Sequence, residues 1–161
     1  MSKESFSDLG VSEPIVAALA RRSIQTPFSI QSLVIPDALA GNDVLAKSPT
    51  GSGKTLAFAA PILQRLDAGD ARPSALVLVP TRELATQVAE EFEAIGRSTG
   101  LKVTAVYGGT SVSAQGKAAK SAHILVATPG RLEDLANRRL VKLDGIRILV
   151  LDEADRMLDM G

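Results

Sequence analysis

The sequence predicts an α/β fold with a mostly parallel sheet and helices on both of its faces. Five short apolar segments alternate along the chain with segments of helical periodicity. Most of these apolar segments lack a polar face, as expected for strands buried on both sides of a parallel sheet. Ligands of such sheets bind beyond the carboxyl ends of the strands, so the segments that directly follow the strands are the candidate sites.

Two helices are expected before the first strand. Ser12 is a suitable N-cap, and Pro14 followed by apolar residues at helical spacing predicts the first helix. Pro27 interrupts the chain, after which Ser29 is a suitable cap for a second helix that ends at Gly41.

The remainder of the chain repeats a strand–helix pattern. Strands are expected at residues 43–47, 75–79, 103–107, 124–127 and 146–151. A helix is expected from about residue 54 to residue 66, another capped by Thr81, and a third with a weak point at Gly116, because glycine lowers helix propensity. A fourth runs through Leu135. His123 is expected at a strand edge.

Composition limits the classes of function. The chain has 161 residues, of which 45% are hydrophobic, so one domain with a proper core is expected. Eighteen basic residues balance 18 acidic ones, so any nucleic-acid contact should rest on a few local loops rather than on a broad basic face. With no cysteine and one histidine, thiol catalysis and Cys- or His-based metal clusters are excluded. The lack of a signal-peptide pattern favours a cytoplasmic protein.

A glycine-rich segment after the first predicted strand is predicted to bind phosphate. Its residues are Ser48, Pro49, Thr50, Gly51, Ser52, Gly53, Lys54 and Thr55. In a strand–loop–helix context the backbone N–H groups point at one spot, Lys54 reaches the β- and γ-phosphates, and the hydroxyl of Thr55 binds Mg²⁺. The strict P-loop pattern has glycine at the position of Ser48. A flexible Gly/Ser linker is the alternative, which the strand before and the helix after disfavour.

Asp152 and Glu153 directly follow the last predicted strand. In P-loop enzymes an aspartate at this place holds Mg²⁺, and the next acid can polarise the attacking water. The alternative is an ordinary acidic first turn of a helix. The P-loop earlier in the chain favours the metal site.

Gln31 is a candidate for selecting the base of a nucleotide. Its side-chain amide offers one donor and one acceptor, which match N6 and N7 of adenine, whereas guanine presents two acceptors. We therefore expect Gln31 to favour ATP over GTP. The alternative is a solvated glutamine on a helix face.

Three further loops, each between a strand and a helix, are candidates for binding the phosphates of a polynucleotide. They are residues 80–85, Gly108-Gly109 and residues 128–131. Helix N-termini together with Arg82 and Arg131 can bind phosphates without reading bases. Routine strand–helix connections are the alternative, and this alternative is favoured for Gly108-Gly109 taken alone.

Together these motifs resemble the DEAD-box ATP-dependent RNA helicases. The resemblance rests on TGSGKT at 50–55, PTRELA at 80–85, TPGR at 128–131, DEAD at 152–155 and a block ending at Gln31. Phe6 stands where that family has the upstream aromatic residue of its adenine motif. The similarity covers essentially the whole chain, in the right order.

The resemblance implies a RecA-like domain over residues 1–161, the first of two and incomplete at its C-terminal end. It implies that Phe6 and Gln31 serve the adenine end of ATP, that Asp152 holds Mg²⁺, and that Glu153 positions the hydrolytic water, with Lys54 also catalytic. It implies RNA-backbone contacts and a coupling residue towards the second domain. The RNA-binding residues would be Pro80, Thr81, Arg82, Gly108, Gly109, Thr128, Pro129, Gly130 and Arg131, and the coupling residue Asp155.

The chain departs from the pattern of this family in several places. The family usually has glycine and then an aromatic residue at the positions of Ser23 and Ile24, so a weaker hold on adenine is expected. Phe28 and Ser29 replace a usual Thr-Pro, and Ser48 replaces alanine.

The Ser-Ala-Thr motif and the second domain of the family are not in the sequence. Slow ATP hydrolysis by this chain alone is therefore expected, as is a gap in the sheet between the P-loop strand and the last strand. A nucleotide-responsive binding module and a DNA-directed relative are the alternative functions.

Overall fold

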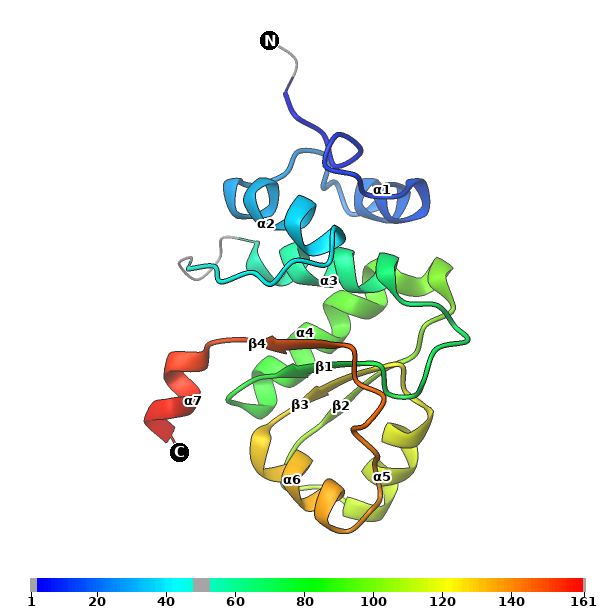
Figure 1. Cartoon of the computed structure of the whole chain (residues 1–161), viewed down its shortest axis with the longest axis vertical. Helices are drawn as coiled ribbons and strands as arrows, with labels where there is room; N and C mark the ends of the chain where they lie inside the picture. The colour runs from blue at the N-terminus through cyan, green and yellow to red at the C-terminus, as the bar shows by residue number, and fades with distance from the viewer. Residues whose placement is uncertain (1–2, 48–52, 161) are drawn as a thin grey trace. The chain divides into compact units, whose positions relative to one another are not determined.

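The computed structural model describes residues 3–47 and 53–160 and divides the chain into two compact units (Figure 1). Unit 1 comprises residues 1–67 and 94–100, and unit 2 comprises residues 68–93 and 101–161. The predicted phosphate-loop residues 48–52 lie outside the described residues.

Unit 1 is helical. It contains α1 (Glu13–Arg21), α2 (Ser29–Leu39), α3 (Lys54–Arg65) and the 3₁₀ helix η1 (Arg97–Thr99). Ser12 is the N-cap residue of α1, as predicted, although its side chain makes no capping hydrogen bond. The N-cap of α2 is Phe28 rather than the predicted Ser29, because the side chain of Gln31 reaches back to accept the Phe28 N–H at 2.8 Å.

Two contacts hold the helices of unit 1 together. Ile30 and Val34 of α2 pack against Ala57 of α3. The side-chain amide of Gln64 accepts a hydrogen bond from the Ser12 N–H at 2.8 Å and donates one to the carbonyl of Gly10 at 2.9 Å. These contacts fix α3 against the segments that precede it in the chain.

The first turn of unit 1 is held by local hydrogen bonds. The N–H of Ser5 donates to the Asp8 carboxylate at 2.8 Å, and the Ser5 hydroxyl accepts from the Asp8 N–H at 3.2 Å. Hydrogen bonds from Ser5 hold the pKa of Asp8 below its usual value, since they favour the charged form. Phe6, in the same turn, is 1% exposed.

Residues 43–47, predicted to form the first strand, have no regular secondary structure. Val44 and Leu45 are exposed, Leu45 fully. A strand is completed by the ladder of a neighbouring strand, and in the described part of the chain none pairs with this segment. The prediction is therefore wrong for this structure, whose sheet has four strands rather than five.

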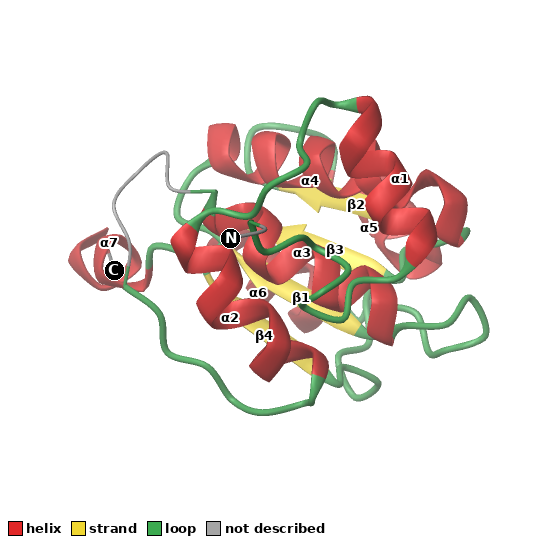
Figure 2. Cartoon of the chain, turned by 90° about the horizontal axis from the view of Figure 1, so that it is seen from above, coloured by secondary structure: helices red, strands yellow, loops and turns green. Residues whose placement is uncertain are grey.

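Unit 2 is built on a parallel sheet with the strand order β2-β3-β1-β4 (Figures 1 and 2). The strands are β1 (Ala75–Leu78), β2 (Val103–Val106), β3 (Ile124–Ala127) and β4 (Ile148–Leu151). The helices are α4 (Arg82–Gly96), whose last residues belong to unit 1, α5 (Val112–Ser121), α6 (Pro129–Asn137) and α7 (Ala154–Met160). All three strand pairings are parallel, so the predicted sheet type is confirmed.

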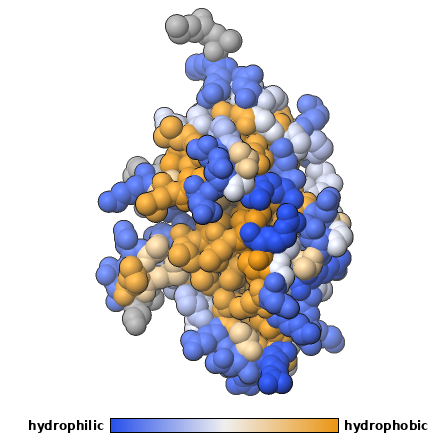
Figure 3. Space-filling view, in the orientation of Figure 1, coloured by the Kyte–Doolittle hydropathy of each residue, from blue (hydrophilic) through white to orange (hydrophobic). Residues whose placement is uncertain are grey.

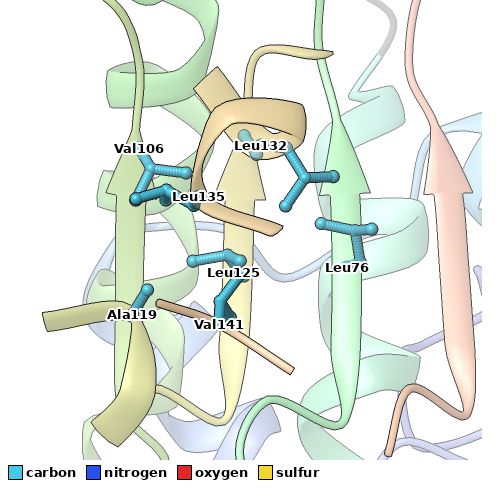
Figure 4. Close-up of a cluster of buried hydrophobic side chains, with 8 residues drawn as sticks. Leu76, Val106, Ala119, Leu125, Leu132, Leu135 and Val141 are labelled. Atoms are coloured by element: carbon cyan, nitrogen blue, oxygen red, sulfur yellow. The ribbon is translucent and has the colours of Figure 1, made fainter. Parts of the chain in front are cut away.

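Helices α5 and α6 cover one face of this sheet (Figure 4). Leu76 and Leu125 from the strands pack with Leu135 from α6 in one buried cluster. Side chains alternate between faces along a strand, and Val77 and Val126 of the opposite face are also fully buried. Burial on both faces explains why the sequences of these strands are continuously apolar and do not alternate with polar residues.

Strand β4 lies at one edge of the sheet. Leu149 and Leu151 are 57% and 55% exposed. Figure 3 shows apolar surface over this part of the molecule. The face of the sheet that α5 and α6 cover at its centre is thus open at β4.

Gly116, predicted to be a weak point of its helix, lies inside α5. Helix α5 runs unbroken through it. A Cβ atom at this position would lie 2.9 Å from the Cβ of Leu140. Glycine is therefore used here for close packing between α5 and the segment that follows α6.

His123, predicted at a strand edge, lies directly before β3 and is fully buried. Its Nδ1 accepts a hydrogen bond from the Lys102 N–H at 3.0 Å, and its Nε2 lies 2.9 Å from the carbonyl oxygen of Ala68. Because Nδ1 is the acceptor, the ring proton is on Nε2 and is donated to Ala68. The imidazole thus joins two loops of unit 2.

Replacing His123 by leucine should lower the free energy of unfolding by about 2 kcal/mol, because the two hydrogen bonds of the buried imidazole to Lys102 and Ala68 are lost. Urea denaturation measures this change. The control is Lys120→Leu on the exposed side of α5, where a change within about 0.5 kcal/mol is expected. Equal denaturation midpoints for His123→Leu and the unsubstituted chain would contradict the structural role.

Ser23, just after α1, has a φ of 61°. This left-handed conformation costs a residue with a Cβ atom about 1–2 kcal/mol, whereas glycine adopts it freely. Ser23→Gly is therefore expected to stabilise the chain by about 1 kcal/mol in thermal unfolding, after the greater flexibility of unfolded glycine is deducted. The matched change Ser113→Gly, inside α5, should destabilise it. A lower melting temperature for Ser23→Gly would refute this explanation.

Candidate functional site

The start of α3 lies where the sequence predicted a helix after the phosphate loop. Gly53 is the N-cap residue, with φ 80° and ψ 21°, and Lys54 and Thr55 form the first turn. The first N–H groups of a helix have no partner within it and favour an anion. The described end of the loop is therefore a helix start, which is compatible with the predicted phosphate site.

Gln31 contacts this turn directly. Its Nε2 donates a hydrogen bond to the carbonyl oxygen of Gly53 at 3.0 Å, while its Oε1 accepts from the N–H of Phe28. Among the described residues the amide has no other partner, so one N–H and one lone pair remain on the group that was predicted to select adenine. The base-selecting candidate and the phosphate turn are thus joined by one hydrogen bond.

Only glycine fits at position 53. A Cβ atom there would collide with Nε2 of Gln31 and would lie 2.7 Å from Cδ2 of Phe28. The positive φ adds backbone strain for any other residue. The second glycine of the loop thus permits the contact with Gln31.

The other residues predicted for the adenine end differ in exposure. Phe28 is 59% exposed, Ile24 is half-buried, and Phe6 is 1% exposed within unit 1. A direct contact between Phe6 and adenine stays a prediction. In this structure Phe6 supports the turn around it through its carbonyl, which accepts hydrogen bonds from the N–H groups of Leu9 and Val11.

The acidic motif in unit 2 follows β4, as predicted. The N–H of Asp152 donates to the carbonyl of Leu78 at 2.9 Å, which continues the pairing of β4 with β1. Asp152 is 5% exposed, and its Oδ1 atom accepts no hydrogen bond from the described residues, although the residue makes other interactions. Glu153 has a φ of 55°, a strained conformation that clusters at functional sites. Asp155 is exposed on α7.

In unit 2 the arginine of the first loop lies against the glycine pair. The Arg82 guanidinium stands 4.8 Å from the centre of the Tyr107 ring, within the range of a cation–π interaction. Gly109 has a φ of 86°, and its Cβ position would be 3.6 Å from Nη1 of Arg82. The loops after β1 and β2 therefore meet, as expected for loops at one edge of a parallel sheet.

The arginine of the third loop binds the loop after β2 as well. Arg131 donates from Nη1 to Oε1 of Gln115 at 2.7 Å and from Nη2 to the carbonyl of Thr110 at 3.2 Å. Gln115 Oε1 also accepts the Tyr107 N–H at 3.2 Å. The structure thus brings Arg82, Gly109 and Arg131 into one connected set.

The remaining residues predicted to bind RNA are in helix starts or next to them. Thr81 precedes α4, and its hydroxyl accepts the Leu84 N–H at 3.3 Å. Thr128 is the N-cap residue of α6 and makes no side-chain capping bond. Gly130 is exposed, and nothing lies within 4 Å of its Cβ position. The start of α6 is therefore accessible to a ligand. Pro80 and Gly108 are in the loops after β1 and β2, and Pro129 is the first residue of α6.

Gln115, Tyr107 and Thr110 also belong to this network but were not predicted from the sequence. Gln115 is an internal residue of α5, and no spacing distinguishes it from a solvated helix glutamine. The only available signal was its place in the helix that follows Gly108-Gly109.

The parallel sheet, the glycine-capped start of α3 and the carboxylate that follows β4 define an α/β protein of the P-loop class. A family model described as DEAD/DEAH box helicase matches residues 28–161, and the chain belongs to this family. None of the described helices is long and apolar enough to cross a membrane.

Individual relatives agree with this assignment. The chain is 48% identical to the DEAD-box ATP-dependent RNA helicase CshA of Streptococcus pneumoniae over 97% of its own length, and 49% identical over 98% to the ATP-dependent RNA helicase DDX47 of Drosophila melanogaster. It spans 30% and 32% of these relatives. The crystal structure of a DEAD box protein from Methanococcus jannaschii aligns over 99% of this chain and 44% of that one, with a TM-score of 0.94 and 40% identity. The RecA-like fold class is thereby confirmed.

Gly53→Ala should lower the affinity for ATP at least about tenfold, because the added methyl group displaces the Gln31 amide and strains the start of α3. Isothermal titration with ATP measures the effect. Gly69→Ala is the matched control, since Gly69 has nothing within 4 Å of its Cβ position. Wild-type affinity in Gly53→Ala would show that the contact is dispensable.

Proposed function

We propose that the chain is the ATP-binding, N-terminal core of an ATP-dependent RNA helicase, which in the full-length protein couples ATP hydrolysis to local unwinding of RNA duplexes. The observation that carries this proposal is the hydrogen bond from Gln31 to Gly53, because it joins the amide that is predicted to select adenine to the turn that is predicted to bind phosphate. The membership of the chain in the DEAD/DEAH box family supports it. A cytoplasmic location stays an expectation of the sequence.

At the phosphate end, Lys54 and the helix start of α3 would hold the β- and γ-phosphates. The oxygen atoms of Asp152 and Thr55 are of the type that Mg²⁺ prefers. Among residues 3–47 and 53–160 no group of three His, Cys, Asp or Glu side chains is placed to hold a metal, so nucleotide phosphates would complete the coordination. When bound, the ion would neutralise charge on the phosphates, and Glu153 would orient the attacking water.

RNA would be bound at the loops that follow β1, β2 and β3. Arg82 and Arg131 supply positive charge, and the backbone at Gly108 and Gly130 is open to a close approach by phosphate. Such contacts bind a strand through its backbone, independently of its base sequence. A second RecA-like domain would complete both the ATP site and the RNA site in the full-length protein, with Asp155 in the coupling between the two domains.

Gln31→Ala tests the proposal at the nucleotide. Loss of the amide should weaken ATP binding about tenfold and GTP binding less, so that the preference for ATP narrows. Titrations with both nucleotides measure the ratio, and Gln87→Ala on the exposed side of α4 is the control. An unchanged ratio of ATP affinity to GTP affinity would remove the role assigned to Gln31.

A further inference from the structure

One side-chain oxygen connects two of the loops that are proposed to bind RNA. Oε1 of Gln115 accepts the Tyr107 N–H, at the end of β2, and a hydrogen bond from Nη1 of Arg131, in the first turn of α6. Gln115 itself belongs to α5 and is half-buried. Its oxygen therefore links three elements of unit 2, namely the end of β2, α5 and α6.

Arg131 is held by one edge of its guanidinium. Nη1 donates to Gln115 and, at 3.5 Å, to the hydroxyl of Thr110, while Nη2 donates to the Thr110 carbonyl. A guanidinium has five N–H groups. Within the part of the chain that the structure describes, three of them have acceptors, which leaves the Nε N–H and one N–H of Nη2 for a ligand. Two such groups form a fork that matches a phosphate.

The same network reaches Arg82. The Thr110 hydroxyl donates to the Tyr107 carbonyl at 3.4 Å, so Tyr107 is held at its N–H by Gln115 and at its carbonyl by Thr110. The Tyr107 ring in turn makes a cation–π contact with the guanidinium of Arg82. Displacement of the Gln115 oxygen would therefore free both arginines to change position relative to Gly109.

We propose that Gln115 is a positioning residue for the RNA backbone, which acts by holding Arg131 and the Tyr107–Thr110 segment in one fixed arrangement. This inference rests on the proposed RNA-binding function. Gln115 does not itself contact RNA. Its effect arises because a fixed set of donors loses less side-chain entropy on binding than two independent arginines do.

Gln115→Met tests the inference, because methionine keeps the length of the side chain and removes the strong acceptor. We expect the affinity of the full-length protein for fluorescein-labelled oligouridylate, measured by anisotropy with an ATP analogue present, to fall about tenfold. The matched control is Gln87→Met on the exposed side of α4, which should bind as the unsubstituted chain does.

A double-variant cycle separates positioning from a general loss of structure. Adding Gln115→Met to Arg131→Ala should cause much less than a tenfold further loss, because the residue that Gln115 positions is already absent. Additive losses, or Gln115→Met binding RNA as tightly as the unsubstituted chain, would overturn the inference. Failure of the unsubstituted full-length protein to bind RNA would instead overturn the proposed function.

The arrangement can also be observed without RNA. Tyr107 is the only tyrosine and the chain has no tryptophan, so near-ultraviolet fluorescence reports on this one ring. Gln115→Met should alter this signal and speed hydrogen exchange at the Tyr107 amide. Gln115→Glu keeps an acceptor oxygen at the same place, so the Tyr107 amide should stay protected from hydrogen exchange. This variant keeps the contact testable if Gln115→Met does not fold. Lost protection in Gln115→Glu, or unchanged exchange in a folded Gln115→Met, would count against the proposed contact.

Discussion

The parallel pairing of the strands in unit 2 is the constraint on which its site depends. Parallel strands end at the same edge, so the residues that follow β1, β2 and β3 meet there whatever their separation in the sequence. Arg82, Tyr107 and Arg131 are examples, since each follows a different strand and all belong to one network of contacts. The burial of both faces of the sheet keeps these strand ends in register. The positions of the loop side chains relative to one another depend on that register.

The elements that depend on local pattern could be predicted from the sequence, and those that depend on a distant partner could not. Helix α4 follows Thr81 as predicted, and its apolar residues Val88 and Phe92 are buried, because helical periodicity is a property of the segment itself. Residues 43–47 have the composition of a strand but no ladder, since a strand also needs a neighbour. The packing role of Gly116 could not be predicted either, because it depends on the distant residue Leu140 and not on the spacing within α5.

The candidate site divides in a similar way. Motif residues such as Arg82, Gly53 and Asp152 were predicted because their chemistry and their place after a strand or before a helix are visible in the sequence. Gln115 was missed because its role consists of accepting hydrogen bonds from two residues outside its own helix. The sequence also predicted that the amide of Gln31 selects adenine, but not that it is bonded to the carbonyl of Gly53. Contacts that position functional residues are therefore the part of a site that cannot be predicted from the sequence and has to be observed in a structure.

The edge position of β4 has a consequence for the stiffness of the acidic motif. Among the described residues β4 pairs with β1 alone, and Asp152 follows directly on that single ladder. An edge strand with exposed apolar side chains is among the parts of a sheet that open most readily. The carboxylate of Asp152 is thus attached to a segment with little local stability, and a strand paired to the outer edge of β4 would raise the free energy needed to displace it. Mechanical support for the carboxylate that is proposed to bind the metal ion therefore depends on completion of the sheet.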